Sequence, residues 1–257
     1  FLLQRQPWLE KDIDMALLKV TEPERIKNVG VFVDNMQNLD GLQEILLNWE
    51  NDYNVFNISP SMYEFSDKAD LLVLINPKKI PTALRYGIDQ FIMRGGRVVV
   101  FFDFFTASQS DLTNSEDVQF VDFLNNWRVN LKTIAADEGR LEKVFGYSPL
   151  GLRLNKAFLF EVDNPAVKVV PFITNENGLV GAVLEGSFSS LYSKNPYAET
   201  ELASTMKPFL KQSLKAGKVA VVGDVDFLEA AFWAAENSPD GNPYSVIEKS
   251  GNGAAAR

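Results

Sequence analysis

Short apolar runs alternate with stripes of apolar residues at helical spacing over the first hundred positions. Apolar runs without polar alternation are typical of strands that are buried on both faces. The expected strands are residues 29–33, 53–58, 71–75 and 98–102. The expected helices cover residues 8–20, residues 38–49 from a cap at Asn38, and residues 81–92, which Gly95 and Gly96 close. This order predicts an α/β fold with a doubly wound, mostly parallel sheet.

The pattern changes in the second half of the chain. A helix over residues 115–127 completes the first part of the α/β domain, residues 1–128. Residues 129–198 read as short strands (158–162, 167–170 and 179–184) separated by polar turns, so we expect a small antiparallel β insertion or lobe.

Residues 199–240 return to the earlier alternation and are expected to rejoin the α/β domain. A helix over residues 200–215 should end at Gly217, and a strand over residues 218–222 should add to the parallel sheet before a last helix. The side chains expected on the buried face of the first of these helices are Leu202, Met206, Phe209, Leu210 and Leu214. Residues 241–257 are expected to form a tail.

Composition excludes much catalytic chemistry. The 257 residues contain no Cys and no His, so thiol nucleophiles, Ser–His relays and imidazole or thiolate metal ligands cannot form within this chain. There are 25 Lys and Arg against 34 Asp and Glu, a formal net charge of −9 without a basic stripe. We therefore expect no nucleic-acid partner. No P-loop motif occurs, and we expect no cofactor and assign no catalytic residue and no metal ligand.

Polar side chains follow the expected parallel strands at their carboxyl ends. The candidate ligand-binding residues are Asp34, Asn76, Asp103, Asp224 and Asp226. Ligand crevices of open α/β sheets lie at this edge, where carboxylates could hold a divalent cation, bind a sugar, or act as the acid–base pair of a glycosidase. Asp is also common after strands because it caps the next turn or helix, and capping is the leading interpretation.

Two aromatic residues follow the fourth expected strand. Phe104 and Phe105 lie beyond Asp103 in a loop, where apolar residues usually contact something. They are candidates for an interaction patch, and the alternative is that they pack beneath the insertion.

Several segments together resemble a known family. They are Leu71–Pro77, the helix Tyr86–Gly96 with its Ile-Asp-Gln and Gly-Gly positions, Arg97–Asp103, Val183–Ser190 and Lys218–Phe227. In order and spacing these segments resemble the auxiliary extracytoplasmic component of gliding-motility-type ABC transporters.

The resemblance implies a class I glutamine-amidotransferase-like (flavodoxin-like) fold without that fold's nucleophilic Cys. It also implies a domain on the extracytoplasmic (periplasmic) face of the bacterial cytoplasmic membrane, anchored by transmembrane segments that are absent from this chain. The implied partners are the membrane and ATPase subunits of the transporter. The resemblance is also compatible with a homo-oligomer. The apolar runs of this chain are far shorter than the roughly 20 residues of a membrane helix, so we expect it to be an excised piece.

Three functions remain open. The leading expectation is a non-catalytic extracytoplasmic interaction module of the transporter's accessory subunit. The first alternative is a receptor for a sugar or divalent cation at the sheet edge that bears Asn76, Asp103 and Asp224. The second is a carboxylate-based glycoside hydrolase, which follows from the chemistry of the same edge.

Overall fold

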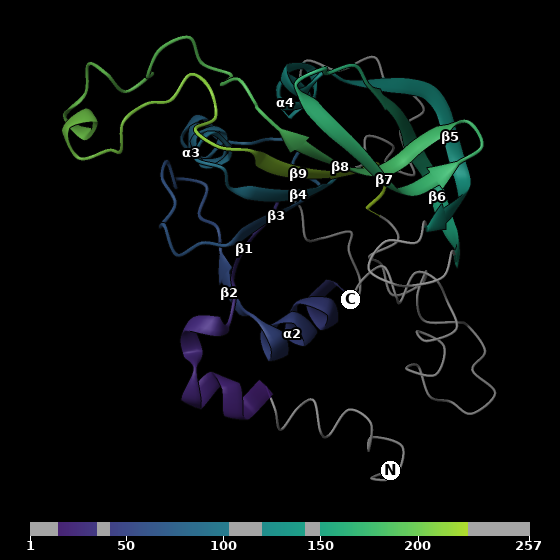
Figure 1. Ribbon diagram of the computed structural model, residues 1–257, viewed down its shortest axis with the longest axis horizontal. Coiled ribbons are helices and arrows are strands. Elements are labelled where there is room, and N and C mark those ends of the chain that lie inside the picture. The colour runs from purple at the N-terminus through teal and green to yellow at the C-terminus, as the bar shows by residue number, and fades with distance from the viewer. Residues whose placement is uncertain (1–14, 35–41, 103–119, 142–149, 226–257) are drawn as a thin grey trace.

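The computed structural model describes residues 15–34, 42–102, 120–141 and 150–225. Its described strands form one mixed sheet in the order β2-β1-β3-β4-β9-β8-β6-β5-β7 (Figure 1). The strands are β1 (Asn28–Val33), β2 (Asn54–Asn57), β3 (Leu71–Ile75), β4 (Arg97–Phe101), β5 (Val129–Leu141), β6 (Leu150–Val162), β7 (Val167–Asn175), β8 (Gly178–Gly186) and β9 (Gly217–Val222). The helices are α2 (Leu42–Asp52), α3 (Thr82–Met93) and α4 (Val121–Trp127), with 3-10 turns η2 (Pro23–Arg25) and η5 (Glu201–Ser204).

The first five strands of the sheet order are all parallel, which confirms the expected mostly parallel sheet. Taken in chain order these strands lie 2-1-3-4-5, the flavodoxin-like arrangement of doubly wound sheets. The expected strand over residues 218–222 joins this sheet as β9, which pairs with β4 in parallel.

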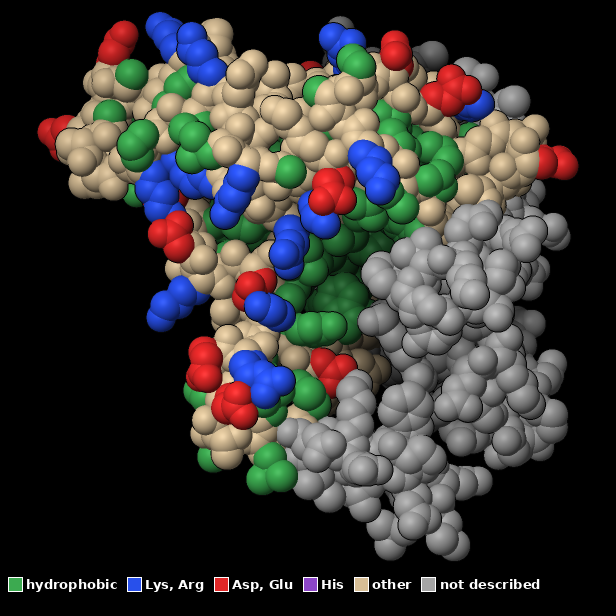
Figure 2. All heavy atoms as spheres, viewed as in Figure 1, with side chains coloured by type: hydrophobic (Ala, Val, Ile, Leu, Met, Phe, Trp, Pro, Cys, Tyr) green, Lys and Arg blue, Asp and Glu red, His purple; other side chains and the backbone are tan. Residues whose placement is uncertain are grey.

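Helices cover both faces of the parallel strands. On one face, α3 packs Leu84, Ile88 and Ile92 against alternate strand residues such as Leu72 and Val98. On the other face, the strand residues of opposite parity pack against α2, and in Figure 2 apolar side chains line the hollow between the sheet and α2. Each fully buried Leu, Ile or Val contributes about 1.5–3 kcal/mol, so the uninterrupted apolar runs are explained by burial on both faces.

The antiparallel strands continue the same sheet. β8 pairs antiparallel with β9 and with β7, and β5 pairs antiparallel with β6 and β7. A single pairing of Phe160 with Leu179 brings β6 back to β8. β5 to β8 therefore form an antiparallel unit beside the parallel strands, at the upper right of Figure 1. The strand β5 was not anticipated, and the proposed boundaries of this lobe stay a prediction.

The helix expected over residues 200–215 does not form. The structure has only the 3-10 turn η5 there, and Gly217 begins β9 instead of ending a helix. Leu202 and Leu214, expected to face inward, are 40% and 72% exposed. The physical reason is Pro208, which has no N–H and which disfavours helical geometry at the residue before it.

The remaining expected helices are only partly within the described residues. Residues 15–21 are helical, but Leu17 and Val20 of the expected inward stripe are exposed there. Asn38, residues 115–119 and the last helix, expected after Asp226, lie outside the described residues. In the part of the chain that the structure describes, no helix is both long and apolar enough to cross a membrane.

Candidate functional site

Asp34 and Asn76 occupy the carboxyl edge of β1 and β3. Their strands are in register with Val33 opposite Ile75, so the two residues follow neighbouring strands at the same level. The Asp34 carboxylate accepts a hydrogen bond from the Lys79 backbone N–H at 2.6 Å, and its own N–H donates to the Ile75 carbonyl at 3.3 Å. Asp34 therefore caps the turn that leads from β3 toward α3, which is the structural role expected for many such residues.

Asn76 differs from Asp34 because its side chain carries an unused acceptor. Its backbone is left-handed, with φ of 48°, and its N–H donates to the Phe101 carbonyl at 2.8 Å. Its Oδ1 atom is buried and accepts no hydrogen bond from any described residue. The junction of β1 and β3 is also where the strand order reverses, the position at which doubly wound sheets form ligand crevices.

Of the other candidates, only Asp224 lies within the described residues, beyond β9, which is separated from β3 by β4 in the sheet. Asp224 is 1% exposed and follows Gly223, whose carbonyl accepts from Phe158 of β6 at 2.6 Å. This contact with the antiparallel unit buries the end of β9. Asp103, Asp226, Phe104 and Phe105 lie outside the described residues, and no cluster of three acidic residues suited to a metal ion occurs among the described ones.

A second group of polar residues, on α3, was missed by sequence reasoning. Asp89 and Gln90 are only 1% and 3% exposed, although they lie in the middle of a helix. Both side chains bind the long segment between β8 and β9, residues 187–216, which we call the strap. The sequence did contain a signal for them, because Asp89 and Gln90 interrupt the apolar stripe of α3. Both residues belong to the Ile-Asp-Gln motif.

Asp89 holds the first half of the strap. Its Oδ2 accepts from the Ser190 hydroxyl at 2.7 Å, and its Oδ1 accepts from the Leu191 N–H at 2.8 Å. A third donor, the Gln90 side-chain amide, reaches Oδ2 at 2.9 Å. Burial raises the pKa of Asp89, and the hydrogen bonds from Ser190 and Leu191 oppose that shift. A buried carboxylate is tolerated when it is hydrogen-bonded in this way.

Gln90 holds the second half of the strap. Its Oε1 accepts from the Leu210 N–H at 2.8 Å, and its Nε2 donates to the Leu210 carbonyl at 3.0 Å. The two halves also bind each other, since the Ser190 N–H donates to the Lys211 carbonyl and the Ser213 N–H donates to the Phe188 carbonyl, both at 2.9 Å. These contacts satisfy backbone groups that a helix would otherwise have satisfied.

Aromatic residues pack at the same junction of α3 and the strap. The Tyr86 ring centroid lies 5.6 Å from that of Tyr192 and 5.3 Å from that of Tyr197, both with edge-on geometry. Phe209 stacks on Tyr86 at 6.5 Å. Burial raises the pKa of Tyr192 to about 12.

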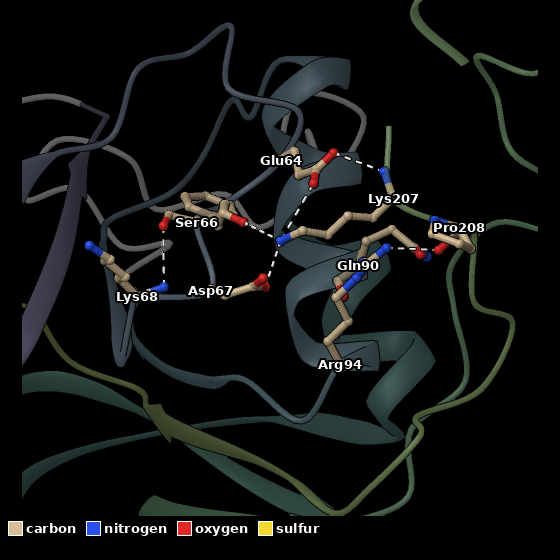
Figure 3. Close-up of polar contacts among 9 residues, drawn as sticks. Glu64, Ser66, Asp67, Lys68, Gln90, Arg94, Lys207 and Pro208 are labelled. Atoms are coloured by element: carbon tan, nitrogen blue, oxygen red, sulfur yellow. Dashed lines mark hydrogen bonds and ion pairs between the residues drawn. The ribbon is translucent and has the colours of Figure 1, made fainter. Parts of the chain in front are cut away.

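The strap meets the loop between β2 and β3 at Lys207, where Glu64 and Asp67 lie close to it (Figure 3), and a cleft lies there. Its volume is about 590 Å³, and its lining residues are Met62, Tyr63, Glu64, Phe65, Ser66, Asp67, Thr205 and Lys207. The Lys207 ammonium donates to the Phe65 carbonyl at 3.0 Å and to Asp67 at 2.7 Å, and the Lys207 N–H donates to Glu64 at 3.1 Å. The hydrogen bond and charge of Lys207 lower the pKa of Asp67.

Arg94 completes the attachment beside this cleft. Its guanidinium donates to the Pro208 carbonyl at 2.7 Å and to the Gln90 carbonyl at 2.8 Å (Figure 3). Proline cannot donate a backbone hydrogen bond, yet its carbonyl remains available and is used here. Polar side chains of α3 and of this cleft are therefore hydrogen-bonded to the strap. Together they fix the position of the strap on the rest of the molecule.

Comparison with known proteins gives one family. A family model described as an ABC-type uncharacterized transport system, of the auxiliary-component type, matches residues 26–171, more than half of the chain. This range contains the first four parallel strands and all of α3. No curated protein matches the sequence.

Solved structures give only distant likenesses. A glutamine amidotransferase from Thermotoga maritima shares 9% identity over 90% of this chain and 95% of its own, with a TM-score of 0.43. A ThuA-like protein from Bacteroides uniformis shares 10% identity over 86% and 96% of the two chains, with a TM-score of 0.38. An exo-β-1,4-mannosidase from Opitutaceae bacterium strain TAV5 shares 10% identity over 78% of this chain, which spans 31% of the mannosidase, with a TM-score of 0.41. These likenesses are too distant to assign an activity.

Proposed function

Since this chain belongs to the auxiliary family of ABC-type uncharacterized transport systems, we propose that it is a non-catalytic interaction module of such a system. The observation that carries the proposal is the family match over residues 26–171. The site chemistry agrees with it, because the buried Asp89 and Gln90 are engaged in holding a surface loop and the chain lacks His and Cys. Folds host unrelated chemistries, so the role is argued from these contacts.

The finer form of the proposal names the system and the place. We propose a transporter of the gliding-motility type, with this domain on the extracytoplasmic face of the bacterial membrane and anchored by segments outside this chain. Its partners are the membrane-spanning and ATPase subunits. The flavodoxin-like strand order supports the amidotransferase-like version of the fold, and the lack of Cys matches a version without that nucleophile.

Co-purification tests this proposal directly. The complete protein, tagged and expressed with its transporter's subunits, is extracted from membranes in mild detergent and captured. Both subunits should be retained in fixed ratio to the tagged protein. If the two subunits purify together but without the tagged protein, the proposal is wrong. An unrelated membrane-anchored protein carrying the same tag is the control.

A second candidate function rests on Asn76. Its buried Oδ1 has no described hydrogen-bond partner and lies at the strand-order reversal, which favours a small ligand with a donor group, such as a sugar, or a cation with oxygen ligands. A thermal-shift screen with Mg²⁺, Ca²⁺ and monosaccharides tests it. A ligand at about 100 times its Kd should add about 2.7 kcal/mol, and the shift should vanish in Asn76→Gly, which keeps the left-handed backbone. A flat screen would remove this candidate.

The glycoside hydrolase is the least supported of the three functions. Of the carboxylates considered for it, Asp34 accepts the Lys79 N–H as a cap and Asp224 is buried. A hydrolase would need one carboxyl group as acid and a second as base or nucleophile, both reaching a sugar. Incubation of the purified protein with aryl glycosides, with Asp34→Asn and Asp103→Asn as controls, checks for turnover.

A further inference from the structure

The middle of the strap, residues 193–206, projects from the body of the molecule. In Figure 1 it is the lime-green loop at the far left, which carries η5 at its tip. We propose that this projecting loop is a docking element for a protein partner whose surface has an apolar pocket bordered by Lys or Arg side chains. The inference rests on the proposed function, since the partner is a subunit of the same transport system.

The projecting loop is held firmly where it leaves the body. One end is bound through Ser190 and Leu191 to Asp89, and the other through Leu210 to Gln90. A buried carboxylate is an expensive anchor for a surface loop. The fold therefore fixes the position of a surface segment that contributes little to its core. Such an arrangement is expected of a loop that is held out for recognition by a partner.

The loop is also ordered within itself. The Thr200 hydroxyl donates to the Tyr197 carbonyl at 2.8 Å, the Ser204 hydroxyl to the Glu201 carbonyl at 2.8 Å, and the Thr205 hydroxyl to the Leu202 carbonyl at 2.9 Å. Such local side-chain to backbone bonds stabilise short turns. A partner would bind this loop without first ordering it, which lowers the entropic cost of association.

The tip of the loop combines an exposed apolar side chain with exposed carboxylates. Leu202 is 40% exposed within η5, and the neighbouring Glu199 and Glu201 are exposed. Lys194 is the single basic residue between 193 and 206. An exposed apolar residue on a fixed element acts as an anchor when it enters a pocket, and the two carboxylates select a basic rim. The same charges disfavour an anionic membrane surface as the partner.

The test uses the complete protein captured with the transporter subunits as described above. Leu202→Asp should reduce the retained subunits at least about tenfold, because it places a charge in the proposed pocket. The matched controls are Leu214→Asp, at the base of the strap, and Leu47→Asp, on α2, since both leucines are exposed in this structure. These control variants should retain the subunits as the unmodified protein does.

A second variant separates docking from folding. Glu199→Lys combined with Glu201→Lys reverses exposed charges without touching the core and should also reduce retention, while the thermal midpoint stays unchanged. If the unmodified protein retains the subunits and both loop variants retain them equally, the docking inference is wrong and the proposed function stands. If the unmodified protein retains none, both fail. A loss of binding to anionic vesicles, without the subunits, in Leu202→Asp but not in Leu47→Asp would show that the loop contacts lipid and would also overturn the inference.

Discussion

Asp89 shows how a single buried charge can organise a distant part of the chain. Its three hydrogen-bond donors come from Gln90 on the same helix and from Ser190 and Leu191, about a hundred residues later. A carboxylate can accept all three, whereas the side chain of Asn cannot, because its amide nitrogen is a donor. The residue therefore acts as the acceptor that fixes the first half of the strap on α3.

Asp89→Asn is expected to destabilise the protein. The amide nitrogen of Asn is a donor, so at least one of the three existing donors loses its acceptor, at a cost of about 1–3 kcal/mol for a buried group. Urea unfolding at neutral pH measures the loss. Glu176→Gln, a similar change at an exposed turn residue, is the control and should be nearly neutral. A loss no larger than that of the control would contradict the assigned role.

The same variant should change how stability depends on pH. Burial raises the pKa of Asp89 above its ordinary 3.8, so between that value and the raised pKa the folded state holds a proton that the unfolded chain has released. The contribution of Asp89 to the free energy of unfolding is therefore fully present below pH 3.8, and it is lost as the pH rises through the raised pKa. Unfolding free energies measured at several pH values should show the advantage of the unmodified protein over Asp89→Asn shrinking in this interval as pH rises. An advantage that grows with pH would contradict the account.

Individual site residues were only partly predictable from the sequence. Position after a strand correctly placed Asp34 and Asn76 at the sheet edge, because carboxyl ends of parallel strands share an edge. It could not show that Asp224 is buried, since that depends on the contact of Gly223 with Phe158, a pairing of segments far apart in the sequence. The role of Asp89 was hidden for the same reason.

Helix α3 is fitted closely to the loop that precedes β3. A Cβ at Gly87 would lie 2.8 Å from the Met62 carbonyl oxygen and 3.0 Å from the Tyr63 carbonyl carbon. Both are backbone atoms, so the loop itself would have to move. This contact positions the loop that forms one wall of the cleft beside Lys207.

Gly87→Ala should therefore destabilise the protein, although alanine is the better helix former by about 1 kcal/mol. Overpacking of this kind typically costs about 1–3 kcal/mol, which outweighs the gain in propensity. Urea unfolding measures the balance, and Ala83→Gly in the same helix reports the propensity effect alone. A Gly87→Ala variant more stable than the unmodified protein would show that the loop moves away freely.

The strap should open locally when its second anchor is altered. Gln90→Glu removes the donor to the Leu210 carbonyl and places a second carboxylate beside Asp89. A loss of about 1–3 kcal/mol in local stability corresponds to about 5- to 150-fold faster exchange, expected at the Leu191 and Leu210 amides. Hydrogen exchange checks this, with Gln212→Glu on the exposed side of the strap as control. Unchanged protection at both amides would contradict the anchoring role.

Elements with local signals were predictable, and those that depend on long-range contacts were not. β1, β3, β4 and α3 form close to where their apolar patterns place them. The apolar spacing of residues 200–215 predicted a helix, but Pro208 and the α3 side chains favour an extended strap. Pattern alone does not distinguish these outcomes when another element supplies the hydrogen-bond partners.

At the scale of the whole molecule, one sheet joins a parallel, helix-covered half to an antiparallel unit, and β9 links the two. The alternation of strands and helices predicted the parallel half. Strand order was not accessible from the sequence, because it depends on pairing between segments and not on local pattern. The strap leaves and returns at the boundary between the two halves, since it connects β8 to β9.

The central claim is that this chain serves a transport system through its projecting loop. Lysine-reactive crosslinking of the complete protein with its transporter, followed by mass spectrometry, tests it most directly. Lys194 is exposed on the loop, while Lys27 and Lys168 are exposed elsewhere and serve as internal references. The account expects crosslinks to transporter subunits to be concentrated at Lys194. Crosslinks to those subunits from Lys27 or Lys168 but none from Lys194, or no crosslinks to the subunits at all, would contradict it.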